Sequence, residues 1–465
     1  MLEAFRNHLE STGLIPPGVR VFVGYSGGAD STCLLHLLHL AGVEVVAGHL
    51  HHGQRNEADD ELLKCQAFCE ELNIPFASGK ADVPRMSSDL KIGLEEAGRR
   101  ARYEFFHQAA FRLECPLIAT AHTKSDHVET ILLHIARGSG LSGLSGIPQR
   151  RGDIVRPLLW ASREATRRYC EDHGLWFHDD PANEDLSFSR ARVRHRLVPE
   201  LKALNPAAEE AIARLSDLAE EEDRFLNGAA AAALEQTEVE LNGQLKFLTL
   251  DIEAGFDRRK LSSLPRVLFR RAVRLAVQAV GANLERDHLA AIEAGLDHET
   301  GSITAEGGDV VVEWKNDVLH VRQLKPTETY RYALTVPGET ISDEFGWQFT
   351  AFPGMGKQER AGLQAVIPAE AIRGPLYFRT AQPGDQMKPL GFEGSRKLSD
   401  LLGEAKLTAA ARARLPILCD LLGPIWAPGI CLDNRMKASN GGQETLIVRF
   451  GPIIPEPSHN IETGV

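Results

Sequence analysis

The sequence predicts an α/β protein whose N-terminal domain is a parallel sheet with helices on both faces. Two observations predict this fold. Short apolar runs alternate with helical patterns over residues 1–205, which is the arrangement of consecutive strand–helix–strand units. The first apolar run leads through a glycine-rich loop, residues 26–31, directly into a helix. A chain of 465 residues is also too long for one hydrophobic core, so further domains are expected.

Three domains are expected in chain order. Residues 1–205 form the parallel-sheet domain. Residues 206–325 form a mostly helical domain, since a long stretch rich in Ala and Glu opens it. Residues 350–450 form a small α+β domain, because they are dense in Gly and Pro and hold only short apolar segments.

The composition is that of a globular protein, with 43% hydrophobic and 25% charged residues. No apolar run reaches the length of a membrane span, and the first residues lack the features of a signal peptide. The seven cysteines are scattered without a C-x-x-C pair, which fits a reducing compartment. We therefore expect a cytoplasmic protein with no membrane partner. The net charge of −12 does not suggest a nucleic-acid binder, although it says little about a local patch.

Four apolar segments of the first domain are predicted strands, and helical patterns lie between and after them. The strands are expected at residues 20–25, 43–48, 75–77 and 116–120, and the helices at residues 32–40, 61–72, 93–113 and 126–137. Ligands of parallel sheets bind at the carboxyl ends of the strands. The loops that begin at residues 26, 49 and 121 all follow strands, so they should converge on one crevice.

The loop after the first strand consists of Ser26, Gly27, Gly28, Ala29, Asp30 and Ser31. A glycine-rich turn at a helix N-terminus is an anion cradle, because backbone N–H groups point outward and the helix dipole favours negative charge. The glycines let the backbone approach a phosphate, and the serines add hydroxyl donors. Asp30 places a carboxylate where phosphates should lie. Because both groups are negative, this position indicates a metal ion or a cationic substrate nearby. The simpler alternative is a serine-rich turn that caps an ordinary helix.

Three histidines follow the second strand: His49, His51 and His52. In an extended segment His49 and His51 share a face while His52 points away, and no further ligand stands at metal spacing. We therefore interpret this segment as a polar loop at the sheet edge, with Arg55 available for phosphate, rather than as a zinc site.

Two carboxylates, Asp126 and Glu129, stand one turn apart at the start of the helix after the fourth strand. Together with Asp30 they could hold Mg²⁺, which prefers a few carboxylates and phosphate oxygens. Asp126 would otherwise serve only as a partner of the helix dipole. On the preceding helix, Arg102 is a candidate phosphate clamp beside the crevice, and a salt-bridged surface helix is the alternative.

Four arginines and no acid occupy residues 188–196, at Arg190, Arg192, Arg194 and Arg196. Arginine suits phosphate backbones because its guanidinium group binds them bidentately. A solvated basic face is the common alternative for such a run. That alternative is less favoured here, because the chain is acidic overall and still concentrates arginine in this segment.

These motifs, in this order, resemble those of the tRNA(Ile)-lysidine synthases, a family of PP-loop ATPases that cleave ATP to AMP and pyrophosphate. In the first domain the matching segments are SGGADS at 26–31, HxxHGxR at 49–55, AHxxxDxxET at 121–130, and residues 95–103, 137–146, 157–159, 180–183 and 190–195. Near the C-terminus they are residues 383–385, 389–391, 395–398 and 415–416. The resemblance covers both ends of the chain, whereas the middle matches only in character.

The resemblance implies an adenine nucleotide alpha hydrolase-like fold for the first domain and a two-step reaction. The wobble cytidine in the CAU anticodon of tRNA(Ile) attacks the α-phosphate of ATP through O2 and releases pyrophosphate. The ε-amine of L-lysine then attacks the adenylated C2 and expels AMP, which leaves lysidine. The modified tRNA reads AUA instead of AUG and accepts isoleucine instead of methionine. ATP, L-lysine and this tRNA are the implied substrates, and Mg²⁺ is the implied cofactor.

The resemblance also implies roles for individual residues. The catalytic residues would be Asp30, Arg102, Asp126 and Glu129, with Asp30 and Asp126 on the metal. ATP would be bound by residues 26–31 with His49 and His52. The tRNA would be bound by Arg190, Arg192, Arg194, Arg196, Arg396 and Lys397. The three domains, 1–205, 206–325 and 350–450, would be catalytic, substrate-binding and tRNA-binding.

Ser125 stands where the family usually has a second acid, which puts a carboxylate pair at residues 125–126 in doubt. Two alternatives to the ligase remain. A thiolating relative with the same loop is weakened by the missing C-x-x-C and by the lack of a sulfur-carrier motif. A nucleotide-sensing binding protein would bind ATP without releasing pyrophosphate. The oligomeric state is open, with a homodimer as one alternative.

Overall fold

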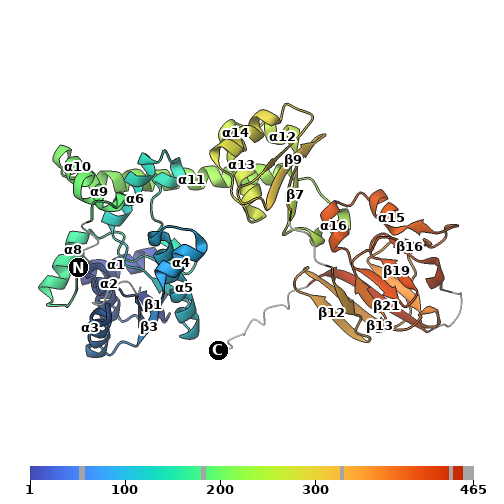
Figure 1. Cartoon of the computed structure of the whole chain (residues 1–465), viewed down its shortest axis with the longest axis horizontal. Helices are drawn as coiled ribbons and strands as arrows, with labels where there is room; N and C mark the ends of the chain where they lie inside the picture. Colours follow the sequence, from blue (N-terminus) through green and yellow to red (C-terminus); the bar gives the residue numbers. More distant parts are fainter. Residues whose placement is uncertain (52–57, 180–184, 325–328, 439–443, 454–465) are drawn as a thin grey trace. The chain divides into compact units, whose positions relative to one another are not determined.

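The computed structural model describes residues 1–51, 58–179, 185–324, 329–438 and 444–453. The chain divides into two compact units, Met1–Phe225 and Leu226–Val465, each of which is described by itself (Figure 1). Within the described ranges, we find no helix that combines the length and the apolar character needed to cross a membrane.

A six-stranded sheet forms the centre of the first unit, with the strand order β3-β2-β1-β4-β6-β5. Its strands are β1 (Val21–Gly24), β2 (Val45–His51), β3 (Phe76–Lys80), β4 (Leu117–Ala119), β5 (Arg150–Arg151) and β6 (Ile154–Val155). All neighbouring strands are parallel except β5, which is antiparallel to β6. The predicted parallel sheet is confirmed.

Helices cover both faces of this sheet, as the sequence predicts. They are α1 (Leu2–Thr12), α2 (Ala29–Leu40), α3 (Ala58–Glu71), α4 (Val83–Leu90), α5 (Leu94–Arg112), α6 (Lys124–Ala136), α7 (Leu141–Leu144), α8 (Arg163–Asp172), α9 (Ser189–Arg192), the π-helix η2 (Val193–Leu197), α10 (Val198–Leu204) and α11 (Ala208–Thr237), which continues into the second unit. Side chains alternate along β1, so Val21 and Val23 face a core with α2, α3 and α8 while Phe22 faces α5. In Figure 1, α2 and α3 lie on one side of β1 and β3, and α4 and α5 lie on the other.

The order of the strands places a crevice at the middle of the sheet. The chain runs from β1 outward to β2 and β3, and then returns to β4 on the other side of β1. Such a reversal opens a crevice at the carboxyl ends of the two central strands, because their following loops diverge. The loop from β1 to α2 and the loop from β4 to α6 therefore border the same space.

The second unit begins with helices and a four-stranded antiparallel sheet in the order β7-β10-β9-β8. Its elements are the 3-10 helix η3 (Gly243–Leu248), β7 (Glu253–Asp257), α12 (Arg258–Ser262), α13 (Arg266–Ala279), α14 (Arg286–Gly295), β8 (Thr300–Thr304), β9 (Val310–Lys315) and β10 (Val318–Gln323). Phe256, Val312 and Leu319 of the sheet share one core with Phe269 and Val273 of α13.

The rest of the second unit is rich in strands and also carries short helices, which confirms the predicted α+β character of this region. One sheet has the order β11-β15-β18-β19-β20 and another β12-β13-β21-β14, with a short pair of β16 and β17. The elements are β11 (Arg331–Ala333), β12 (Gly338–Ser342), β13 (Trp347–Pro353), β14 (Gln364–Pro368), η4 (Ala369–Ala371), β15 (Tyr377–Arg379), β16 (Gln386–Met387), β17 (Arg396–Lys397), α15 (Leu398–Glu404), α16 (Ala409–Arg414), β18 (Ile417–Asp420), β19 (Gly423–Ala427), β20 (Cys431–Leu432), η5 (Asn434–Met436) and β21 (Thr445–Pro452). The two larger sheets share a core that includes Trp347, Phe378 and Trp426.

Candidate active site

The loop between β1 and α2 depends on glycine at its turn. Gly27 has a φ of 80°, a left-handed conformation that residues with a side chain rarely adopt. A Cβ atom at Gly27 would also lie 2.9 Å from Cys65 Sγ and 3.0 Å from His178 Nδ1. Glycine is therefore required both for the backbone conformation and for space.

The serines of this loop hold its shape and leave the first backbone groups of α2 open. Ser26 Oγ lies 3.1 Å from Ser31 Oγ, and Ser31 Oγ donates to the carbonyl of Gly28 over 2.9 Å. Within the part of the chain that the structure describes, the backbone N–H groups of Ala29 and Asp30 donate no hydrogen bond. Open N–H groups at a helix N-terminus are suited to bind phosphate.

His49 lies buried beside this loop, at the carboxyl end of β2. Its Nδ1 is 3.0 Å from the carbonyl oxygen of Tyr25, and because a carbonyl only accepts, Nδ1 carries the proton. Burial lowers the pKa of His49, so the ring is neutral at pH 7 and Nε2 is an acceptor. His52, the other histidine predicted to bind ATP, and Arg55 lie outside the described residues.

Asp126 and Glu129 lie together in the first turns of α6, as predicted. Both the backbone N–H and the hydroxyl of Thr123 donate to Asp126 Oδ2 over 2.8 Å, and this capping box fixes the start of the helix. Glu129 lies one turn further along, and its side chain is only 2% exposed. Ser125 is buried and its Oγ accepts a hydrogen bond from the backbone N–H of Arg163 over 3.3 Å.

Three arginines contact these two carboxylates. Arg163, the first residue of α8, donates to Asp126 Oδ1 over 2.6 Å and to Glu129 Oε1 over 2.8 Å. Arg190 lies 2.9 Å from Glu129 Oε2 and 3.3 Å from Asp126 Oδ1. Arg194 donates to both oxygens of Glu129, over 2.8 and 3.2 Å. The two carboxylates are thus surrounded by guanidinium groups from α8, α9 and η2.

Asp30 joins the same group of charges from α2. Its Oδ2 lies 3.7 Å from Arg163 Nε, and its Oδ1 accepts a hydrogen bond from the hydroxyl of Thr166. Arg163 therefore contacts all three of the predicted catalytic carboxylates. We call these carboxylates and their three arginines the charge cluster; its members are Asp30, Asp126, Glu129, Arg163, Arg190 and Arg194, and its formal charge is zero.

The three carboxylates of the charge cluster differ in pKa. Burial would raise the pKa of Asp126, but the neighbouring guanidinium groups hold it at about 2. Burial also opposes the charge of Glu129, and Arg194 and Arg163 together lower its pKa below the usual value. At Asp30, burial and the negative charge of Asp126 raise the pKa to about 6. Asp30 is therefore the least compensated carboxylate of the cluster.

The donor set at Asp30 and Asp126 fits Mg²⁺ only together with further oxygen ligands. Among the described residues, no three His, Cys, Asp or Glu side chains are grouped as a metal site. Two carboxylates completed by phosphate oxygens and water are, however, a usual arrangement for Mg²⁺. Asp30 is itself in the first turn of α2, so an ion on it would adjoin phosphates held by that helix.

The predicted tRNA-binding arginines divide between two faces of one helical segment. Arg190 and Arg194 are four residues apart and face α6, where they meet the carboxylates. Arg192 and Arg196 are exposed, and neither side chain pairs with any of the residues that the structure describes. The buried Val193 packs against α6 and fixes which side turns inward.

Arg102 is not part of the charge cluster. It lies on α5 with its side chain exposed, and it makes no ion pair or hydrogen bond to the cluster within the described ranges. His122, which follows β4, is closer to the carboxylates: it interacts with the charge of Asp126, and desolvation lowers its pKa to about 4.

Arg163 and Thr166 are contacts that the sequence pattern does not reveal, whereas His122 belongs to the AHxxxDxxET motif but was given no role from the sequence. Arg163 begins a helix with an ordinary N-cap, Ser162, and nothing in its neighbourhood marks it as a site residue. The feature that could have pointed to Arg163 is its position after β6, because β6 lies beside β4 in the sheet. A loop that follows a strand at this edge can reach the same crevice.

Comparison with known proteins identifies the family of the chain. Residues 3–201 match the family model of the PP-loop domain, and residues 376–448 match that of the TilS substrate C-terminal domain. The tRNA(Ile)-lysidine synthase of Geobacillus kaustophilus is 31% identical, with 96% of this chain and 98% of that protein aligned. The chain belongs to the tRNA(Ile)-lysidine synthase family. The synthases of Symbiobacterium thermophilum (30% identity; 96% and 97% aligned) and Geobacter sulfurreducens (30%; 94% and 94%) are similarly related. The resemblance drawn from the motifs is confirmed.

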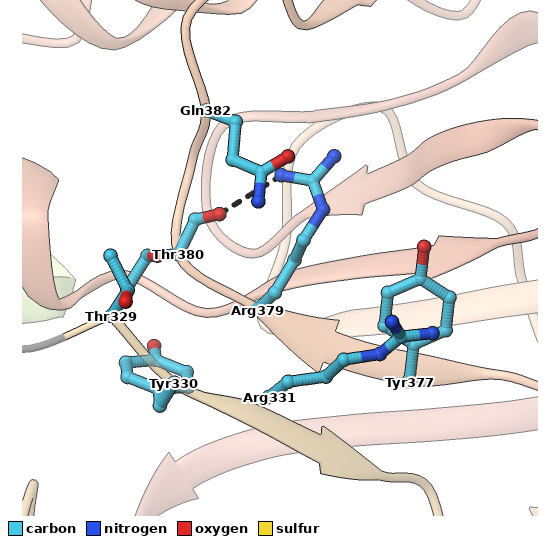
Figure 2. Close-up of a pocket in the computed structure, with 7 residues that line it drawn as sticks. All are labelled: Thr329, Tyr330, Arg331, Tyr377, Arg379, Thr380 and Gln382. Carbon is cyan, nitrogen blue, oxygen red and sulfur yellow. Dashed lines mark hydrogen bonds between the residues drawn. The ribbon is translucent and has the colours of Figure 1, made fainter.

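A second polar site lies in the C-terminal region of this lysidine synthase family member. A cavity of about 310 Å³ opens where β11 pairs with β15 (Figure 2). Figure 2 shows Arg331 lying against the ring of Tyr377, and its guanidinium carbon is 4.0 Å from the ring centroid. The residues that line the cavity are Thr329, Tyr330, Arg331, Tyr377, Arg379, Thr380 and Gln382.

The two arginines of this cavity are in different states. Asp385 binds Arg379 through both carboxylate oxygens, each over 2.7 Å. Arg331 is exposed and has no carboxylate partner among the described residues. Of the two predicted tRNA-binding residues nearby in sequence, Arg396 pairs with Glu404 over 3.0 Å and Lys397 is exposed.

Proposed function

We propose that the charge cluster is the active site in which this chain forms lysidine on tRNA(Ile) at the expense of ATP. As a member of the lysidine synthase family, the chain is an ATP-dependent ligase. One observation carries the assignment of the site: Arg163 joins Asp30, at the start of the phosphate-binding loop's helix, to Asp126 and Glu129. A phosphate cradle, carboxylates and cations therefore share one crevice.

In the first step, O2 of the wobble cytidine attacks the α-phosphorus of ATP and the bond to pyrophosphate breaks. The open N–H groups at the start of α2 would hold the phosphates, and the nearby guanidinium groups would offset the negative charge that develops. Asp30 and Asp126 would be the protein ligands of Mg²⁺, which when bound polarises phosphate oxygens as a Lewis acid.

In the second step, the ε-amine of lysine attacks C2 of the adenylated cytidine, the C2–O bond breaks and AMP leaves. The attacking nitrogen must lose a proton. Asp126 and Glu129, one turn apart on α6, would hold the ammonium form of lysine and receive that proton.

The cysteines disfavour the thiolating alternative. All seven are free and buried, and burial raises the pKa of Cys65, Cys69, Cys419 and Cys431 to about 12. Sulfur transfer requires an accessible thiolate, which a buried thiol with a raised pKa does not supply.

The remaining assignments are proposals of the same kind. We propose that tRNA contacts the exposed Arg192 and Arg196 and the C-terminal residues Arg331 and Lys397, where cations are open to a phosphate backbone. We also propose domain boundaries at residues 205 and 325 and a cytoplasmic location. A homodimer is a further proposal, and light scattering of the purified protein tests it.

Incubation of the purified protein with ATP, labelled lysine and unmodified tRNA(Ile) tests the function. The expected products are AMP, pyrophosphate and tRNA that carries the lysine label. ATP cleavage without label on the tRNA would contradict the proposed reaction. The matched negative substrate is a methionine-accepting tRNA, which has the same CAU anticodon and should take up no lysine.

A further inference from the structure

The carboxylates that we assign to lysine are already occupied by arginine. Glu129 Oε1 accepts hydrogen bonds from Arg163 and Arg194, and Glu129 Oε2 accepts from Arg190 and Arg194. Asp126 Oδ1 accepts from Arg163 and Arg190, and its Oδ2 accepts from the helix N-cap. All four carboxylate oxygens therefore have partners before any substrate cation arrives.

A further cation cannot enter this arrangement without displacing one of the arginines. The charge cluster is neutral, with three carboxylates and three guanidinium groups, and the Glu129 side chain is almost fully buried. An ammonium group added to a neutral, buried cluster would lack a counter-charge and a hydrogen-bond acceptor, which is costly in a poorly solvated site.

The three arginines are not equally able to leave. Arg163 touches all three carboxylates, and its backbone N–H is tied to Ser125 at the start of α6. Arg190 and Arg194 come from α9 and η2, and the side chain of Arg190 is 35% exposed. Their neighbours Arg192 and Arg196 already face solvent on the same helical segment. The two inner arginines thus adjoin both the carboxylates and the face that we propose for tRNA.

We propose that Arg190 and Arg194 are exchangeable counter-ions, which exclude lysine from Asp126 and Glu129 until the phosphates of bound ATP and tRNA draw them away. Guanidinium groups bind phosphate bidentately as readily as carboxylate, so the exchange replaces one strong pairing by another. The consequence is an order of binding: ATP and tRNA come first, and lysine follows. This proposal rests on the proposed role of Asp126 and Glu129 in lysine binding.

Equilibrium binding of labelled L-lysine tests this proposal on the full chain. We expect the free wild-type protein to bind lysine at least ~10-fold more weakly than the protein with α,β-methylene-ATP and unmodified tRNA(Ile). The double variant Arg190→Gln with Arg194→Gln should bind lysine without the other substrates, about as well as the wild-type complex does. Arg167→Gln, which removes an exposed arginine of α8 paired with Asp179, is the matched control and should behave as wild type.

The outcomes distinguish a failure of the arginine exchange from a failure of the proposed lysine site at Asp126 and Glu129. Equal lysine affinity of the free and the complexed wild type would overturn the exchange, as would a folded double variant with no gain in lysine binding. The single variant Arg190→Gln, which leaves Arg163 and Arg194 on Glu129, gives the same test with a smaller gain if the double variant does not fold. Absence of lysine binding in every sample, while the ATP analogue still binds, would instead contradict the proposed role of Asp126 and Glu129.

Discussion

The charge cluster and the C-terminal cavity both hold arginines beside carboxylates, but they balance charge differently. In the charge cluster, Glu129 is shared by Arg163 from α8 and by Arg190 and Arg194 from the adjoining α9 and η2, which lie more distant in the sequence. In the cavity, Arg379 pairs with the carboxylate of Asp385, six residues further along the same stretch of chain, and also donates to the carbonyl oxygen of Thr380. A shared carboxylate can exchange its partners, whereas a single bidentate pair fixes a local structure.

The comparison also shows that arginines close together in sequence need not act together. Arg190 and Arg194 compensate buried carboxylates, while Arg192 and Arg196 between and beyond them are exposed. In the cavity, Arg379 is compensated and Arg331 is open. We therefore expect the inner arginines to affect chemistry and the open ones to affect tRNA affinity.

The largest effect is expected from Asp30→Asn in the charge cluster. The variant should release pyrophosphate about 10³-fold more slowly, since a metal ion held at the phosphates is worth several kcal/mol. Affinity for tRNA should stay close to that of the wild type. Single-turnover pyrophosphate release and filter binding measure the two quantities. Asp153→Asn, which removes an exposed carboxylate paired with His107, is the control; an Asp30 variant as active as this control would rule out the role of Asp30.

Asp385→Asn probes the structural pair of the cavity. The variant should lower the free energy of unfolding by about 3 kcal/mol at pH 7, because it leaves the largely buried Arg379 without its carboxylate. Despite burial, Arg379 holds the pKa of Asp385 below its ordinary value of 3.8. The stabilisation is therefore present above about pH 4 and is lost as the pH falls further. Urea unfolding measures it, and Arg331→Gln should unfold like the wild type.

The sequence predicted the framework of the site better than its contacts. Alternating apolar and helical segments predicted the parallel sheet, and the loops after β1 and β4 bring Asp30, Asp126 and Glu129 together. Those positions follow from the strand–loop–helix alternation and from helical spacing, both of which are local patterns. Arg163 could not be predicted in this way, because its contacts depend on how α8 packs beside α6.

The inward turn of Arg190 and Arg194 was equally hidden. Composition showed a basic run, but the side that faces the carboxylates is set by packing of Val193 against α6. At Ser125 the sequence was informative, because it showed that the family's usual second acid is absent. In the structure, the hydroxyl of Ser125 at this position accepts a hydrogen bond from the backbone N–H of Arg163 at the start of α8. Arg102 was selected for its helical face and lies outside the cluster, so its role as a clamp remains a prediction.

A pH profile distinguishes Asp30 from the compensated carboxylates. Burial and the charge of Asp126 raise the pKa of Asp30 to about 6, so it binds a proton, and no longer a cation, below that pH. At Mg²⁺ concentrations below saturation, pyrophosphate release should fall as the pH drops below 6, because a proton then competes with the metal ion for Asp30. The profile of Asp30→Asn should lack this inflection. A wild-type rate that is flat between pH 5 and 7 would contradict the assignment.

The smallest effect is expected at the open arginines. Arg192→Gln or Arg331→Gln should each weaken tRNA binding by about threefold, and the slope of log affinity against log salt should decrease by about one. Arg100→Gln, which removes an exposed arginine paired with Glu96, is the control. Unchanged affinity and slope for both variants would place the tRNA elsewhere on the molecule.

Glu129→Asp gives the most direct test that the charge cluster carries the lysine step. The substitution keeps the negative charge for Arg163, Arg190 and Arg194 but withdraws the carboxylate by one methylene group. A misplacement of this size costs about 10²-fold in rate when the group positions a reactant. We predict that pyrophosphate release stays near the wild-type rate while transfer of labelled lysine to the adenylated tRNA falls by that amount. Lysine transfer at the wild-type rate, or an equal loss in both steps, would contradict the assignment of lysine to this site.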